Sequence, residues 1–223
     1  GHTLFDAITL FIQTPLQGVL TGLPGYLFLF FISTVLWTFG IHGTQVLGPI
    51  YVSTLLIALT ENTEAVSVGL EPTNILNRAF VNIFTIPTGA GITFGLIVAI
   101  LLFSTREDHR AIAKLSIVPG IFNINETMTF GLPIVLNPIF MIPFVPAPVV
   151  SATIGYTLTK IGFATPLVYD VPWTTPPLLA AFIASGGHIP TVITQALAIA
   201  SSVLIYTPFV FIANKQQQEK LDD

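Results

Sequence analysis

Four long stretches of this sequence contain no Asp, Glu, Lys or Arg. They run from Ala7 to Thr60, Ala79 to Thr105, Thr127 to Thr159 and Val171 to Asn214. Only 8% of the 223 residues are charged, whereas soluble domains average about a quarter, so the chain cannot build a water-soluble surface. About 20 consecutive apolar residues suffice for a helix to cross a bilayer. The sequence therefore predicts an all-α polytopic membrane protein in contact with lipid.

Apolar segments are expected near residues 4–20, 26–41, 46–60, 79–103, 132–158 and 189–213. The first three are short, and 26–60 is equally typical of tilted helices and of re-entrant hairpins. We therefore predict about five transmembrane helices together with re-entrant hairpins. Segment 79–103 contains Pro87 and three glycines, and a broken helix is tolerated where protein or a watery cavity satisfies the freed backbone groups. We expect this segment to line such a cavity.

Basic residues follow two of the apolar segments. They are Arg106, Arg110 and Lys114 after the fourth segment, and Lys215 and Lys220 after the last. The positive-inside rule places both groups in the cytoplasm, which requires an even number of crossings between them. The net charge of -4 gives no indication of nucleic acid binding, and the absence of cysteine excludes disulfides and metal-thiolate sites.

Two ionisable residues stand out within apolar surroundings. Glu126 lies in FNINETMTFGLPIVLNP, residues 122–138, and an ionisable residue at membrane depth typically marks a substrate or ion path. A carboxylate is also favourable in the first turn of a helix. His42 lies between Gly40 and Gly43, which would let the backbone approach a ligand closely, although a single histidine in an apolar run is more often structural. There is no HExxH motif, and no metal site is expected.

Amide and indole side chains accompany these two residues. Asn123, Asn125 and Asn137 can both donate and accept hydrogen bonds, which suits a polyhydroxylated ligand better than a bare ion. Trp37 and Trp173 each lie near a polar break in the apolar pattern. They either anchor the chain at the membrane interface or stack on sugar rings.

Two motifs carry a family resemblance. GIHG at 40–43, followed by GPI, and GIFNINE at 120–126, followed by FGLPIVLNP at 130–138, resemble the membrane permease subunit IIC of the bacterial phosphotransferase system, lactose/cellobiose/diacetylchitobiose family. The resemblance implies a multi-pass protein of the bacterial plasma membrane that binds a β-linked disaccharide. It also implies that a phosphorylated cytoplasmic IIB subunit phosphorylates the sugar during translocation.

The resemblance also implies roles for particular residues. Glu126 would accept the proton of a sugar hydroxyl, and His42 would bind the sugar and stabilise developing charge. Asn125, Trp37 and Trp173 would be further sugar contacts. The chain has neither cysteine nor a GxxxxGK[ST] loop, so the phosphoryl donor is expected on the partner. No cofactor is expected, and the chain would act as a phosphotransferase only together with its partner subunits.

Members of this family are longer and form two domains. We therefore expect residues 1–223 to be the C-terminal, substrate-binding part, and the N-terminal part that supplies a homodimer contact to be absent. Other functions remain open from the residues alone. Glu126 could be the coupling site of an ion-coupled secondary sugar transporter without phosphorylation. His42 and Glu126 could be the acid–base pair of an intramembrane enzyme, or the chain could be a structural membrane segment without activity.

Overall fold

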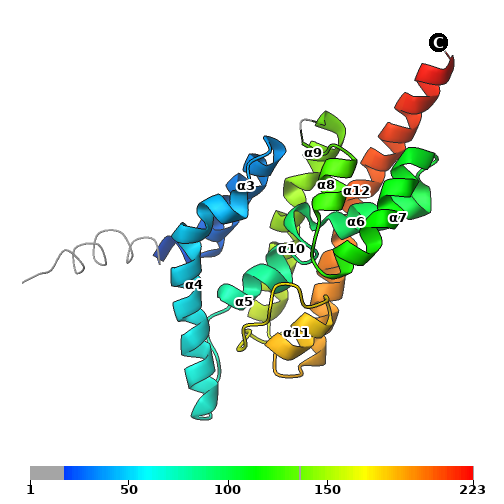
Figure 1. Ribbon diagram of the computed structural model, residues 1–223. Coiled ribbons are helices and arrows are strands. Elements are labelled where there is room, and N and C mark those ends of the chain that lie inside the picture. The colour runs from blue at the N-terminus through cyan, green and yellow to red at the C-terminus, as the bar shows by residue number, and fades with distance from the viewer. Residues whose placement is uncertain (1–17, 136, 223) are drawn as a thin grey trace, which may run out of the picture.

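The computed structural model describes residues 18–135 and 137–222, with side chains up to residue 216. Every regular element among these residues is helical (Figure 1), which confirms the predicted all-α fold. The elements are α3 (Leu23–Thr38), α4 (Gly43–Ser67), α5 (Arg78–Phe80), the π-helix η2 (Val81–Thr85), the 3-10 helix η3 (Ala90–Ile92), α6 (Thr93–Phe103), α7 (Glu107–Ile121), α8 (Glu126–Gly131), α9 (Pro138–Phe144), α10 (Pro146–Lys160), α11 (Leu179–Ala184) and α12 (Ile189–Asp222).

Four helical segments in the described residues are long and apolar enough to cross a membrane. They are Gly43–Ser67, Arg78–Phe103, Pro138–Lys160 and Ile189–Gln216. Helix α3 is also apolar but is only 16 residues long, and most of the predicted segment 4–20 lies outside the described residues. Large apolar side chains are exposed on these helices, for example Leu204 at 75%, as expected where a surface meets lipid. The chain is a multi-pass membrane protein.

The segment predicted at 46–60 is part of a longer helix. Helix α4 continues through Glu61 and Glu64 and ends only at Ser67. Both carboxylates are exposed, and glutamate is a good helix former. The charge-free run therefore marks the part of α4 that suits lipid, whereas the helical backbone continues beyond it.

The helices form two groups that meet in the middle of the molecule. Helix α12 packs between α6 and α10, and α7 covers α6. Helices α3 and α4 lie together on the other flank, where α3 contacts α10 and α4 contacts α5 (Figure 1). One buried apolar cluster centres on Phe80 and Phe84, and a second on Leu96 and Phe144. The broken segment 78–103 contributes to both clusters and connects them.

The break in segment 78–103 is held by side chains from the turn after α7. The backbone N–H of Thr88 donates to Asn123 Oδ1 at 2.7 Å. The Ala90 carbonyl accepts from Asn125 Nδ2 at 2.8 Å. These bonds satisfy backbone groups that the interrupted helix leaves without partners. The segment also lines a cavity through Ile86, Gly89 and Ala90, as the sequence predicted.

The two basic segments lie at the same end of the molecule. Asn214 Oδ1 accepts hydrogen bonds from Ser104 Oγ at 3.2 Å and from the Thr105 N–H at 3.1 Å. These contacts bring the end of α6 against α12, next to both groups of basic residues. The segments Pro138–Lys160 and Ile189–Gln216 lie between them in the chain. These two candidate crossings agree with the even number that the positive-inside rule requires.

Candidate functional site

A cavity of about 370 Å³ lies where α3, α4, the broken segment and the turn after α7 meet. Its lining consists of Trp37, His42, Thr44, Gln45, Gly48, Tyr51, Val52, Arg78, Asn82, Ile86, Gly89, Ala90, Asn123, Asn125, Glu126 and Trp173. All five site residues predicted from the sequence are among them. The structure therefore brings the motifs GIHG and GIFNINE together around one cavity. The identity of the ligand that binds there stays a prediction.

His42 caps the N-terminus of α4. Its Nδ1 accepts from the Gln45 N–H at 3.3 Å and lies 3.1 Å from Thr44 Oγ1. A ring nitrogen that accepts carries no proton, so in the neutral ring the proton is on Nε2, which is then a hydrogen-bond donor. The ring centroid lies 4.2 Å from that of Trp37. His42 therefore has both a structural bond and a free donor.

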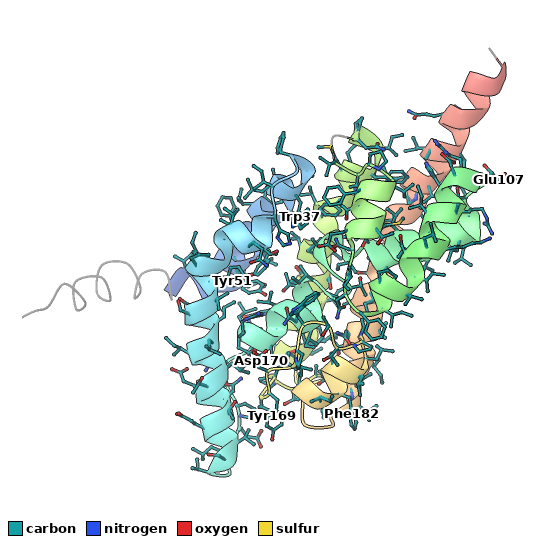
Figure 2. The ribbon with its side chains drawn as sticks, in the orientation of Figure 1. Trp37, Tyr51, Glu107, Tyr169, Asp170 and Phe182 are labelled. Carbon is teal, nitrogen blue, oxygen red and sulfur yellow. The ribbon has the colours of Figure 1, made fainter. Side chains whose placement is uncertain are left out.

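Trp37 is buried, with only 4% of its surface exposed. Figure 2 shows Trp37 and Tyr51 on the sides of α3 and α4 that face the rest of the molecule. The buried indole Nε1 of Trp37 has no hydrogen-bond partner, which is unfavourable. An interfacial anchor would keep this N–H among lipid headgroups, so Trp37 does not act in that way. Trp173, in contrast, is 57% exposed.

Gly43 allows α3 and α4 to approach each other closely. A Cβ atom at this position would lie 1.9 Å from the backbone oxygen of Ser33 in α3. The close approach that Gly43 permits here is between two helices, and the approach of a ligand to the backbone between Gly40 and Gly43 stays a prediction. This packing places His42, at the start of α4, against Trp37 near the end of α3.

Glu126 is the first residue of α8 and is exposed. It lines the cavity and also stands in the first turn of a helix, and its role toward a substrate or ion stays a prediction. Asn125 is 5% exposed and is bonded to the Ala90 carbonyl. A Cβ atom on Gly89, which has φ 92, would lie 2.9 Å from Asn125 Cγ. The turn that carries Glu126 is therefore packed tightly against the broken segment.

The side chain of Asn123 hydrogen-bonds backbone groups of the segments that surround the cavity. Its Nδ2 donates to the carbonyls of Trp173 at 2.6 Å and Thr175 at 2.8 Å, while its Oδ1 accepts from Thr88. These bonds tie three separate segments together beside the cavity. Asn137 caps α9 instead and does not line the cavity. The three asparagines of the motif therefore do not serve a ligand together.

Several lining residues were missed by sequence reasoning. Gln45 lies three residues after His42, which is the spacing of one helical turn. Arg78 and Asn82 are four residues apart, and Arg78 Nη1 lies 3.5 Å from Asn82 Oδ1. The four-residue spacing, which places two side chains on one face of a helix, could have identified this pair from the sequence. Arg78 stands at the edge of a charge-free run, where a basic residue looks like an ordinary loop charge.

A second cavity, of about 390 Å³, lies at the basic end of the molecule. Its lining includes Arg106, Asp108, His109 and Asn137. Hydrogen bonds from the Arg106 guanidinium lower the pKa of Asp108 to about 2. Burial lowers the pKa of His109 to about 4, so this ring is neutral at neutral pH. Apart from Asn137, whose side chain caps α9, the residues singled out in the sequence motifs do not line this cavity.

Known proteins resemble the chain over its whole length. The PTS system cellobiose-specific EIIC component of Lactococcus lactis subsp. lactis (strain IL1403) is 34% identical over 244 residues, which cover 100% of this chain and 49% of that protein. The lichenan permease IIC component of Bacillus subtilis (strain 168) is 32% identical over 223 residues, with coverage of 100% and 49%. The chain thus spans about half the length of these relatives.

A solved structure has the same fold. The crystal structure of the transporter ChbC, the IIC component from the N,N'-diacetylchitobiose-specific phosphotransferase system, superposes with a TM-score of 0.91 at 34% identity. The match covers 99% of this chain and 52% of that one. The family model described as "Phosphotransferase system, EIIC" matches residues 2–148. The chain therefore belongs to the EIIC family of the phosphotransferase system.

Proposed function

We propose that this chain is the substrate-binding part of a sugar permease, which takes up a β-linked disaccharide while a partner subunit phosphorylates it. The observation that carries the proposal is the convergence of His42, Glu126, Asn125, Trp37 and Trp173 on one cavity. The relatives are named for cellobiose and lichenan, and the structural neighbour for N,N'-diacetylchitobiose. These names support a sugar with β-linkages as the ligand.

The cavity offers what a sugar ring needs. Trp37 and Trp173 are among the lining residues, and an aromatic face can pack against the apolar C–H groups of a pyranose. His42 Nε2 and the amide of Gln45 can hydrogen-bond sugar hydroxyls. The unpartnered Nε1 of Trp37 would gain a partner if a sugar oxygen or a small adjustment of the ring brought an acceptor within reach. Binding would then give this buried N–H a partner.

Glu126 is suited to accept the proton of the attacking hydroxyl. Phosphoryl transfer depends mainly on positioning and electrostatics, and a base must orient the nucleophile and take its proton. Glu126 is the acidic residue of the cavity lining, and its carboxylate is exposed. The donor would be a phosphorylated IIB subunit, which must reach the cavity from the cytoplasmic side during the transport cycle.

We further propose that residues 1–223 correspond to the C-terminal half of a longer IIC permease. Such a permease would form a homodimer through its N-terminal half and lie in the bacterial plasma membrane. The coverage of 49% of the relatives supports a half-length unit. In this proposal the dimer contact belongs to the other half of the longer permease.

Uptake into membrane vesicles tests whether transport is coupled to phosphorylation. We expect vesicles that contain the permease and phosphorylated IIB to accumulate phosphorylated disaccharide, and to do so equally well when an ionophore collapses the ion gradients. Accumulation of unmodified sugar that stops with the ionophore would instead establish ion-coupled secondary transport, with Glu126 as the coupling site.

Variants of His42 separate its bond to the helix from its contact with sugar. His42→Ala removes both the cap of α4 and the imidazole, so we expect a loss of about 1 kcal/mol of stability and at least tenfold weaker sugar binding. His42→Asn restores a cap acceptor. We expect it to recover thermal stability while sugar binding, measured by equilibrium dialysis, stays weak. Recovery of binding in His42→Asn would mean that His42 acts only through the cap.

A further inference from the structure

The lining of the candidate cavity contains two charged residues, Arg78 and Glu126. Arg78 is the first residue of α5 and is half-buried. It lies at the edge of a stretch without charged residues that extends to Thr105. The formal charges of Arg78 and Glu126 cancel, so the lining is balanced for a ligand without charge.

Arg78 has spare hydrogen-bonding capacity. Among the side chains that the structure describes, no carboxylate lies within ion-pair distance of it. Its bond to Asn82 is long, at 3.5 Å. Arg106, by contrast, donates to both carboxylate oxygens of Asp108 at 3.1 and 2.6 Å. A guanidinium presents five N–H donors in a planar fork that matches a carboxylate or a phosphate. Arg78 therefore has the means to bind an anion at the cavity.

The proposed reaction creates such an anion. A disaccharide is neutral, whereas a phosphate monoester carries about -1.5 to -2 charges at neutral pH. Glu126 repels these charges, and the repulsion is stronger in a partly buried site than in water. Arg78 is the lining residue whose charge can offset it. Without Arg78, the lining would be negative when the phosphoryl group arrives.

We propose that Arg78 binds the phosphoryl group during its transfer to the sugar and in the product, an inference that rests on the proposed function. In the transfer, a sugar oxygen forms a bond to phosphorus, and the hydroxyl proton passes to Glu126. The bond between phosphorus and the donor side chain of IIB breaks, and its electron pair stays on that side chain. Arg78 stabilises the charge on the phosphoryl oxygens by charge-assisted hydrogen bonds. The long contact with Asn82 Oδ1, at 3.5 Å, leaves the guanidinium able to turn toward the phosphoryl oxygens.

Binding of neutral and phosphorylated sugar distinguishes this role from a structural one. The permease in lipid nanodiscs is titrated with radiolabelled cellobiose and, in competition, with cellobiose that carries one phosphate on a primary hydroxyl. We expect Arg78→Gln to weaken binding of the phosphorylated sugar at least tenfold and to change cellobiose binding less than twofold. Arg106→Gln, which removes a cation outside the cavity, is the matched control and should change neither affinity.

Arg78→Lys provides a second variant in case Arg78→Gln fails to fold. It keeps the charge but loses the planar fork, so we expect binding of the phosphorylated sugar to fall a few-fold while cellobiose binding is retained. Equal losses for the two ligands, or no loss for either, would overturn the role of Arg78. Failure of the unmodified permease to bind cellobiose, lactose or diacetylchitobiose is a separate result, which overturns the proposed function and this inference with it.

Discussion

Glu126→Gln should keep measurable sugar binding and lose phosphorylation. Glutamine has nearly the same shape and can still hydrogen-bond a hydroxyl, but it cannot accept a proton at neutral pH. General-base catalysis typically contributes about 10²–10⁴-fold to a rate, and we expect the rate of sugar phosphorylation by phosphorylated IIB to fall by that factor. The measurement is single-turnover transfer of labelled phosphate to cellobiose, together with the dissociation constant of cellobiose.

Glu107 provides a matched control for this variant. Like Glu126, it is the first residue of its helix and is exposed, and Figure 2 shows it far from Trp37 and Tyr51, which line the cavity. Glu107→Gln makes the same chemical change and should leave both binding and transfer unaltered. If Glu126→Gln lost binding and phosphorylation to the same extent, Glu126 would be a sugar ligand and not the base. Undiminished transfer would exclude it from the chemistry.

Gly43→Ala should disrupt the site through the fold. The added methyl group would lie 1.9 Å from the Ser33 backbone oxygen, so α3 and α4 must move apart. Overpacking of this kind typically destabilises by about 1–3 kcal/mol, and the forced separation also moves His42 away from Trp37. We expect a lower midpoint of thermal unfolding and no detectable sugar binding.

Gly48→Ala tests whether the effect is specific to the helix contact. Gly48 lies on the same helix. Apart from its chain neighbours and the nearby helix backbone, the atom nearest to a Cβ atom at Gly48 would be Val52 Cγ2, at 4.0 Å. Alanine is usually favoured over glycine in a helix interior by about 1 kcal/mol, but the ring of Pro49 disfavours a Cβ atom on the residue before it, so we expect a change in unfolding temperature much smaller than that of Gly43→Ala. A Gly43→Ala protein that unfolded like the unmodified chain would contradict the tight α3–α4 contact.

Much of the fold follows from the sequence because the positions of charged residues and the lengths of apolar runs can be read from short stretches of the chain. The apolar runs predicted the long helices, and Pro87 with its neighbouring glycines predicted that segment 79–103 is broken. Helix ends were less predictable, since Glu61 and Glu64 end the charge-free run without ending α4. The side-by-side arrangement of α3 and α4 depends on the contact of Gly43 with Ser33, and no local pattern reveals a contact between helices.

Part of the candidate site could also be predicted from local sequence patterns. His42 and Glu126 stand out because ionisable residues are rare in apolar surroundings. The different roles of the three asparagines were not predictable. The hydrogen bonds of Asn123 to Thr88, Trp173 and Thr175 join residues that are distant in sequence. Arg78 escaped notice because its position in the cavity depends on tertiary packing.

Direct binding of sugar to this chain tests the central claim that the cavity is a disaccharide site. Labelled cellobiose, lactose and diacetylchitobiose are titrated into the purified chain in lipid nanodiscs, and the titration is repeated with His42→Ala. We predict saturable binding of at least one of these sugars and at least tenfold weaker binding in the variant. Binding that His42→Ala leaves unchanged, or no binding of any of the three sugars, would contradict the site described here.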